Sequence, residues 1–241
     1  MRAIVILPVH LGSTRLPRKF LQEINGVPLF WRAFKEAERV FPCPVMLAAP
    51  LSERDQWLAA ARDCDLEPEQ CFVFTSEGLR NGTERCADAA TILEGPVPGN
   101  SWLGQPPYEV VVNCQADMPY LRPEFIRVFE RLADPRIEMA TLAGDWGDRR
   151  NDGPHVVKVI GEEEKDFTRR DVDEAAVHIG IYAYKRDALR RYAATQPADR
   201  ELGEGLEQLR CPDAGIRIGV TYLTHAVKAI DVPGDLLHAG L

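Results

Sequence analysis

The sequence predicts a three-layer α/β fold, with helices on both faces of a mostly parallel sheet. Its 241 residues are 45% hydrophobic, which is enough apolar material for one sizeable core. The candidate strands are continuous aliphatic runs, as in strands that are buried on both faces. They alternate along the chain with segments of helical periodicity, and this alternation indicates parallel strands joined by helices.

The first half of the chain supplies the clearest elements. Ala3–Leu7 is an aliphatic run that predicts a buried parallel strand leading into a polar loop. Pro28–Val40 places apolar residues at a helical period, with Lys and Glu on the opposite face. Ser52 is a suitable N-cap for a helix over Glu53–Cys64. Further strands are predicted at Val45–Ala49, Cys71–Thr75 and Glu109–Cys114, and a helix at Thr83–Leu93.

The second half continues the alternation. Pro123–Ala133 has the pattern of an amphipathic helix. Gly161–Ala175 is densely charged, which predicts a mobile or solvated excursion. The remaining predicted elements are strands at Met139–Ala143, Val156–Ile160, Ile179–Tyr184, Ile216–Leu223 and Ala226–Ile230, a helix at Arg186–Thr195 and a short final helix opened by Asp231–Asp235.

The overall charge limits the possible partners. With 37 acidic and 29 basic side chains the net charge is −8, which repels nucleic acid and anionic membranes. No apolar run approaches the roughly 18 residues of a membrane span. We expect a cytoplasmic protein that neither binds nucleic acid nor inserts into a membrane, and whose anionic substrate needs a local basic pocket. The cysteines form no C-x-x-C pair, so we expect reduced, mostly buried thiols.

A polar loop after the first strand is a candidate anion site. Gly12, Ser13 and Thr14 are small residues that let backbone N–H groups approach an anion. The planar guanidinium group of Arg15 can make two parallel hydrogen bonds to a phosphate, and the ammonium group of Lys19 adds a compact positive charge. The loop matches neither G-x-x-x-x-G-K-[ST] nor G-x-G-x-x-G, which argues against a P-loop NTPase and a dinucleotide-dependent dehydrogenase. A solvated basic turn is the alternative interpretation.

Two aspartates follow predicted strands. Asp117 comes just after Glu109–Cys114, and Asp231 comes just after Ala226–Ile230. Ligands of open α/β sheets bind at the carboxyl ends of the strands, where both side chains could hold Mg²⁺ together. The alternative is structural, with Asp117 forming a turn and Asp231 capping the last helix.

Seven motifs occur in order along nearly the whole chain. They are S-T-R-L-P-x-K at 13–19, N-G-x-P at 25–28, N-G-T-E-R at 81–85, N-x-Q-x-D-x-P at 113–119, H-x-G-I-Y-x-Y at 178–184, E-x-L-E-Q-L-R at 204–210 and I-D-V-P-x-D-L at 230–236. With these motifs the chain resembles the 3-deoxy-D-manno-octulosonate cytidylyltransferases, also called CMP-Kdo synthetases.

The resemblance implies a Rossmann-like nucleotidyltransferase fold, usually assembled as a homodimer. Residues 1–241 would form one nucleotidyltransferase domain, of which approximately 120–225 carry the acceptor-binding and dimerisation part. In this family the anomeric hydroxyl of a sugar acid attacks the α-phosphate of CTP, with Mg²⁺ as the cofactor. The products are a CMP-sugar and pyrophosphate.

The resemblance also assigns roles to individual residues. The catalytic residues would be Arg15, Lys19, Asp117 and Asp231. Of these, the two cations would offset charge on the leaving pyrophosphate, and the two aspartates would hold Mg²⁺. The nucleotide-binding residues would be Pro8, Gly12, Ser13, Thr14, Arg15, Lys19, Asn81, Gly82 and Thr83. The acceptor-binding residues would be Gln115, His178, Glu204 and Gln208, whose hydrogen-bonding side chains suit a polyhydroxylated ligand.

Several positions depart from the family's pattern. The family usually has Pro-Ala-Arg where this chain has Pro8-Val9-His10, and Pro-Gly-Lys where it has Pro17-Arg18-Lys19. Pro50 and Met118 replace acidic residues of two family motifs, and the charged stretch Glu162–Glu174 replaces an S-R-x-x-I-P segment. Two alternatives therefore stay open. The acceptor could be another acid, such as a modified octulosonate, a nonulosonate or a phosphonate, or the chain could bind nucleotide without catalysis.

Overall fold

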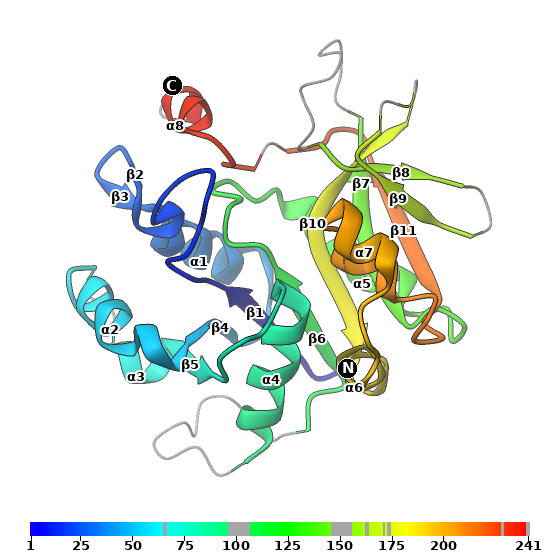
Figure 1. Cartoon of the computed structure of the whole chain (residues 1–241), viewed down its shortest axis with the longest axis horizontal. Coiled ribbons are helices and arrows are strands. Elements are labelled where there is room, and N and C mark those ends of the chain that lie inside the picture. Colours follow the sequence, from blue (N-terminus) through cyan, green and yellow to red (C-terminus); the bar gives the residue numbers. More distant parts are fainter. Residues whose placement is uncertain are drawn as a thin grey trace. The chain divides into compact units, whose positions relative to one another are not determined.

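The computed structural model describes residues 1–64, 67–95, 107–145, 156–161, 164–170, 172, 175–227 and 229–239 (Figure 1). The chain divides into two compact units, the first made of Met1–Arg122 and Lys228–Leu241 and the second of Pro123–Val227. The α/β class is confirmed, and parallel pairs dominate the sheet of the first unit.

The first unit contains the amino-terminal strands and helices and the carboxyl-terminal helix. Its strands are β1 (Ala3–Pro8), β2 (Glu23–Ile24), β3 (Val27–Pro28), β4 (Val45–Pro50), β5 (Phe72–Thr75) and β6 (Val110–Cys114). Its helices are η1 (Lys19–Leu21), α1 (Leu29–Val40), η2 (Leu51–Glu53), α2 (Arg54–Arg62), α3 (Pro68–Cys71), α4 (Gly82–Glu94) and α8 (Pro233–Ala239). The four strands predicted in the first half of the chain therefore form, as β1, β4, β5 and β6. The three helices predicted between them form as α1, α2 and α4.

Four parallel strands form the sheet of this unit, in the order β6-β1-β4-β5. Val5 of β1 lies beside Val45 of β4, and Ala3 lies beside Val110 of β6. All 6 residues of β1 are buried, and so are all 6 of β4. Helices on both faces account for these continuous apolar sequences.

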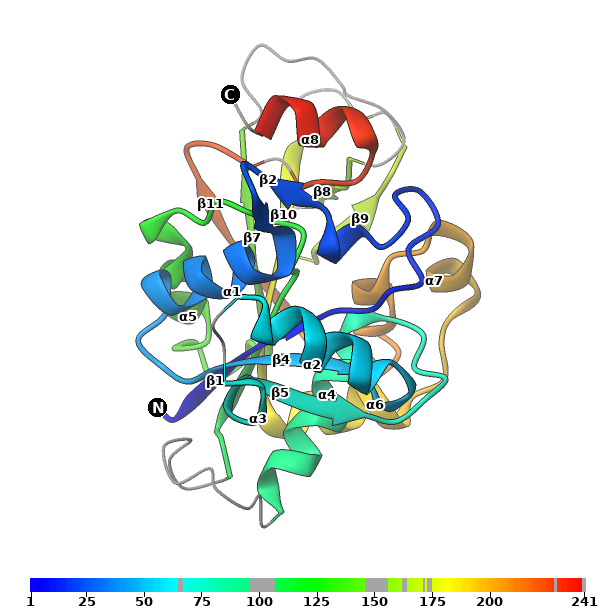
Figure 2. The same cartoon turned by 90° about the vertical axis from the view of Figure 1, so that its left-hand side faces the viewer.

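The strand order reverses direction at β1. The chain runs from β1 outward through β4 to β5, and then returns to place β6 on the other side of β1. Right-handed crossovers therefore put α1 and α4 on opposite faces of the sheet, as Figures 1 and 2 show. The loops that follow β1 and β6 diverge at this switch point, which is where open α/β sheets bind ligands.

The second unit is built on a mixed sheet. Its strands are β7 (Met139–Gly144), β8 (Lys158–Ile160), β9 (Asp166–Thr168), β10 (Ala176–Lys185) and β11 (Ile218–Leu223). Its helices are η4 (Pro123–Arg127), α5 (Val128–Arg131), α6 (Arg186–Ala194), α7 (Asp199–Glu204) and η5 (Glu207–Arg210). Strand β7 pairs with β11 in parallel and with β10 in antiparallel orientation. Strand β8 lies between β10 and β9 and is antiparallel to both.

The first residues of two helices differ from what the sequence predicts. Ser52 does not cap α2, because its N–H and its hydroxyl both donate to Glu77. Residues Pro123–Ala133 start as the 3₁₀ helix η4 and are α-helical only over Val128–Arg131. Phe125 of η4 and Val128, the first residue of α5, are both buried and three residues apart, a spacing that puts their side chains on one face of either kind of helix.

Two other segments have a different structure from the one that the sequence predicts. The charged stretch Gly161–Ala175 was expected to be solvated or mobile, yet its described residues include β9, where Phe167 is buried. Residues 162, 163, 171, 173 and 174 of this stretch lie outside the described residues. The strand expected at Ala226–Ile230 does not form among the residues described there, because Ala226 and Ile230 make single backbone hydrogen bonds rather than a ladder.

All the cysteines are free, as expected, but only half are buried. Three are buried, namely Cys86, Cys114 and Cys211. The other three are half-buried, namely Cys43, Cys64 and Cys71. In the part of the chain that the structure describes, no helix combines the length and the apolarity needed to cross a membrane.

Candidate active site

Lys19 and two aspartates meet in the first unit. The Nζ atom of Lys19 lies 2.7 Å from Oδ2 of Asp117 and 3.2 Å from Oδ1 of Asp231. Lys19 begins the short helix η1, and Asp117 follows β6 by three residues. The two carboxylates therefore converge on one ammonium group at the switch point of the sheet.

Backbone contacts hold both aspartates in place. The N–H of Ile230 donates to the carbonyl of Asp117 at 2.8 Å, which ties the carboxyl-terminal segment to the loop after β6. Oδ2 of buried Asp235 accepts from the N–H groups of Asp231 and Val232, at 2.9 and 3.0 Å. The carboxylate geometry is thus set by the scaffold.

The charges of this cluster favour a protonated lysine. Burial opposes the charge on Lys19, but attraction to Asp117 and Asp231 outweighs it and raises the pKa of Lys19 above its ordinary value. Arg15 adds an ion pair, with its Nη2 atom 3.3 Å from Oδ1 of Asp231. The four residues that the sequence analysis assigned to catalysis therefore lie in one charged cluster.

The loop between β1 and η1 offers backbone donors. Within the described residues, the N–H groups of His10, Gly12, Ser13 and Thr14 have no hydrogen-bond partner. Such amides can bind an anion. Arg18 precedes Lys19 in the left-handed region, at φ 51° and ψ 39°, which a glycine adopts more easily.

The residues at 81–83 begin helix α4. The side-chain oxygen of Asn81 accepts the N–H of Glu84 at 2.8 Å, so Asn81 is the N-cap. Thr83 is fully buried, and its hydroxyl accepts from the amide of Asn113 at 3.1 Å. Asn81 and Thr83 therefore have structural contacts in addition to any ligand.

Gly82 lies where three elements converge. A Cβ atom at Gly82 would be 3.0 Å from Cγ of Pro8 and 3.0 Å from Nε2 of Gln115. Only glycine therefore allows this approach without displacing its neighbours. The geometry brings Pro8, Gly82 and Gln115 together at the carboxyl ends of β1 and β6.

The two aspartates can be tested as a metal site. In the described part of the chain, no group of three or more His, Cys, Asp or Glu side chains is arranged to hold a metal ion. Asp117 and Asp231 do supply two hard carboxylate ligands that already converge on one cation. Mg²⁺ usually takes one or two protein carboxylates and completes its shell with water and phosphate oxygens, so this donor pair fits that ion.

In the second unit, His178 is held in one tautomer. Its Nε2 atom lies 2.9 Å from Oγ1 of Thr141, and that hydroxyl is 2.7 Å from the carbonyl of Ile181. Because the carbonyl can only accept, the hydroxyl donates to it and Nε2–H of His178 donates to the hydroxyl. The Nδ1 atom is therefore the hydrogen-bond acceptor of the ring.

His178 is neutral at ordinary pH. The residue as a whole is half-buried, but Phe167 and Tyr182 enclose its ring, with centroid distances of 5.3 and 5.1 Å. Burial, and secondarily the charge of Arg169, lower the pKa of His178 to about 3. The ring is thus suited to accept a hydrogen bond at Nδ1 rather than to pair with a carboxylate.

Gln208 is close to the same cluster. Its Oε1 atom accepts from the hydroxyl of Tyr182 at 3.4 Å. Its buried Nε2 atom has no hydrogen-bond partner among the described residues. A buried donor of this kind indicates a missing acceptor, such as a ligand or a water molecule.

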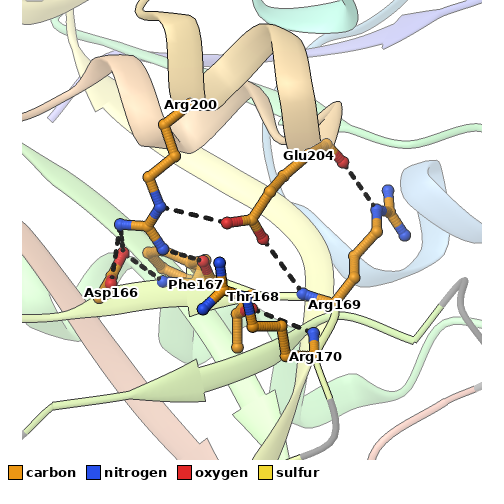
Figure 3. Close-up of polar contacts among 7 residues, drawn as sticks. All are labelled: Asp166, Phe167, Thr168, Arg169, Arg170, Arg200 and Glu204. Atoms are coloured by element: carbon orange, nitrogen blue, oxygen red, sulfur yellow. Dashed lines mark hydrogen bonds and ion pairs between the residues drawn. The ribbon is translucent and has the colours of Figure 1, made fainter.

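Glu204 has a different environment (Figure 3). Its Oε1 atom accepts from Nε of Arg200 at 3.2 Å, and its Oε2 atom accepts from the N–H of Arg169 at 3.3 Å. Its carbonyl also accepts from Nε of Arg169 at 3.0 Å. The side chain therefore joins α7 to the segment after β9.

Arg200 completes this connection. Its Nη1 atom contacts both oxygens of Asp166 at 2.9 Å, and its Nη2 atom donates to the carbonyl of Phe167 at 3.0 Å. Arg200 and Arg169 were not among the predicted site residues, because the charge density around Asp166 predicts a solvated stretch. The aromatic Phe167 amid charged residues was the available signal for a buried strand.

Comparisons with known proteins agree with this architecture. The family model described as Cytidylyltransferase matches residues 4–218. The 3-deoxy-manno-octulosonate cytidylyltransferases of Rhodopseudomonas palustris strains BisB18 and BisA53 are 33% and 34% identical to this chain. These alignments cover 98% and 97% of the chain, and 95% and 93% of the relatives.

A solved structure adds the nucleotide. The CMP:2-keto-3-deoxy-manno-octonic acid synthetase complexed with CTP is 26% identical, with a TM-score of 0.79. The alignment covers 100% of this chain and 97% of the synthetase chain. The fold is thus that of a nucleotidyltransferase. The chain belongs to the cytidylyltransferase family, and within it to the 3-deoxy-manno-octulosonate cytidylyltransferases.

Proposed function

We propose that this protein transfers CMP from CTP to Kdo or a Kdo-like sugar acid, with Mg²⁺, and releases pyrophosphate. The observation that carries the proposal is the convergence of Asp117 and Asp231 on Lys19 beside a loop with available amides. The names of the relatives and the CTP in the solved synthetase support the same activity.

In the proposed reaction, the anomeric oxygen of the acid forms a bond to the α-phosphorus of CTP. The bond from that phosphorus to the oxygen of the β-phosphate breaks, pyrophosphate leaves and the hydroxyl proton passes to solvent. Such transfers depend on positioning and charge stabilisation rather than on a protein nucleophile. Arg15 and Lys19 would offset charge on the leaving pyrophosphate.

The nucleotide would bind on the first unit. The N–H groups of Gly12, Ser13 and Thr14 would hold triphosphate oxygens, because they have no partner within the described residues. The segment Asn81–Thr83, with Pro8 packed against Gly82, would line the nucleotide pocket.

Asp117 and Asp231 would hold the Mg²⁺ ion. Bound there, the ion would neutralise phosphate charge and orient the phosphates. Lys19 now pairs with both carboxylates, so it would exchange one or both of these contacts for a phosphate oxygen when the nucleotide binds.

In the second unit, we propose that His178 and Gln208 contact the acceptor, whereas the role of Gln115 stays a prediction. The support in the second unit is the Nδ1 acceptor of His178 and the orphaned Nε2 donor of Gln208, which suit the hydroxyl groups of a sugar. Glu204 would serve the acceptor by holding Arg169, whose charge lies near His178. The homodimer and the cytoplasmic location stay predictions.

The test is pyrophosphate release from CTP and Mg²⁺ with Kdo and a panel of sugar acids and phosphonates, with the other nucleoside triphosphates as controls. We expect release with CTP and Kdo. Release with no acid, despite tight CTP binding, would favour the non-catalytic alternative.

A second candidate keeps the chemistry and changes the acid. The observation that favours it is the contact of the Glu204 carboxylate with Arg200 and Arg169, which occupies a group assigned by resemblance to the acceptor. A panel in which Kdo outcompetes every other acid would reject this candidate.

A further inference from the structure

The carboxylate of Glu53 holds the loop after β1 at one point. Its Oε1 and Oε2 atoms each lie 3.0 Å from the backbone nitrogen of Leu11. Glu53 ends the short helix η2 after β4, 42 residues from Leu11. This contact therefore joins the candidate nucleotide loop to the neighbouring strand connection.

The carboxylate is itself fixed by a buried indole. Nε1–H of Trp57 donates to Oε2 of Glu53 at 2.9 Å. Trp57 is fully buried, and its ring contacts those of Phe30 and Phe72 at centroid distances of 5.5 and 5.9 Å. Because the indole cannot move without disturbing the core, Oε2 is a rigid acceptor for the loop.

The rest of the loop backbone has few restraints. The N–H of Val9 continues the sheet by donating to the carbonyl of Ala48, and the next backbone bond begins at Leu21, which donates to Arg18. Between these points, in the part of the chain that the structure describes, Leu11 alone among residues 10–14 has a partner for its N–H. The Leu11 contact thus determines where the following amides lie.

A carboxylate at this place opposes anion binding by its charge. His10 and Arg85 are close enough for the charge of Glu53 to act on both. A negative charge near a triphosphate lowers affinity unless another effect outweighs it. The geometry accounts for a carboxylate here, because it can accept from Leu11 and from Trp57 at once.

We propose that Glu53 is a positioning residue for CTP, which holds Leu11 so that the amides of Gly12, Ser13 and Thr14 are presented to the triphosphate. This inference rests on the proposed nucleotide-binding function. It separates two effects of Glu53, the negative charge and the hydrogen-bond acceptor, which substitutions can remove one at a time.

The experiment measures CTP affinity by calorimetry for the full chain and two variants. In Glu53→Gln, an amide oxygen at the place of Oε2 can still accept from Leu11 and Trp57, so affinity should be equal to the wild type or higher. In Glu53→Leu both acceptors are lost, and we expect affinity to fall about tenfold, the effect of one hydrogen bond. A role limited to charge would raise affinity in both variants.

Glu77→Leu is the matched control. Glu77 accepts from the N–H of Ser52 at 2.7 Å and from its hydroxyl at 3.0 Å, so it holds the other end of the same turn. We expect Glu77→Leu to leave CTP affinity unchanged. Equal losses in Glu77→Leu and Glu53→Leu would show a general effect of the turn and would overturn the inference.

A second readout needs no nucleotide. Trypsin can cleave the loop after Arg15, and we expect this cleavage to be faster in folded Glu53→Leu than in the wild type or in Glu53→Gln. Unchanged CTP affinity and unchanged cleavage in Glu53→Leu would reject the positioning role. A wild-type protein without CTP affinity would overturn the proposed function and this inference with it.

Discussion

Lys19 and Asp117 form a short ion pair in which Nζ lies 2.7 Å from Oδ2, with side chains only 10% and 16% exposed. The partners are 98 residues apart in sequence. Asp231 approaches the same ammonium from the carboxyl-terminal segment. The ammonium group of Lys19 stabilises both carboxylates in the folded protein, and these three groups are the ones that the proposed reaction would use.

Asp117→Asn should lower pyrophosphate release from CTP about 100-fold, because it removes a charge placed for metal and phosphate. Steady-state rates at saturating Mg²⁺ give the measurement. Asp55→Asn is the control, since Asp55 is 96% exposed and lies on α2. An undiminished rate in Asp117→Asn would show that the metal assignment is wrong.

Lys19→Met should destabilise the fold by about 1–3 kcal/mol, because it leaves Asp117 without its cation and Asp231 with Arg15 alone. The carboxylates should then bind Mg²⁺ more readily, so MgCl₂ without CTP should raise the melting temperature of the variant more than that of the wild type. Thermal denaturation with and without MgCl₂ measures both effects. An identical Mg²⁺ response in the two proteins would contradict the shared site.

His178 should stay neutral from pH 8 to pH 5, because its folded pKa is about 3. The unfolded chain binds a proton near the ordinary pKa of about 6.5, whereas the folded chain does not. Stability is therefore fully present above pH 6.5 and is lost as the pH falls towards 3. We expect constant imidazole NMR shifts for His178 over pH 8 to 5.

The same linkage can be tested by substitution. In His178→Gln, the free energy of unfolding should depend less on pH between 6.5 and 4 than in the wild type. A His178 resonance that titrates near pH 6.5 would contradict the buried, neutral ring.

Arg200→Met should raise the KM for the acid acceptor several-fold and leave the KM for CTP unchanged. The reason is that Arg200 holds β9 through Asp166 and Phe167, and the Phe167 ring packs edge-on against His178. Arg190→Met is the control, because Arg190 makes an exposed pair with Asp187 on α6. Equal changes in both KM values would refute a role confined to the acceptor.

Arg210→Met should cost about 3–5 kcal/mol, because it leaves a buried carboxylate unpaired. Arg210 and Glu201 form two hydrogen bonds of 2.7 and 2.6 Å, at 1% and 6% exposure, and the guanidinium lies 4.4 Å from the centroid of the Tyr192 ring. Urea denaturation measures the loss. The double variant Glu201→Leu/Arg210→Met should be more stable than Arg210→Met alone, and a less stable double variant would contradict this account.

The periodicity of the sequence was sufficient for most regular elements of the first unit. β1 and β4 are continuous apolar runs because both of their faces are buried, and α1 carries a clear apolar stripe. Local patterns were insufficient where a distant partner decides the outcome. Ser52 resembles an N-cap but donates to Glu77, and Phe167 is a strand residue because β8 pairs with its segment.

The fold class, the family and the position of Asp117 just after an apolar strand could be predicted from the sequence alone, because these depend on local periodicity and on ordered motifs. The folded chain was needed to show that Lys19 lies between Asp117 and Asp231, and that Glu204 contacts Arg200 and Arg169. Such contacts join residues up to 212 positions apart. They depend on the order of the strands and on the burial of charge, which neighbouring residues in the sequence do not specify.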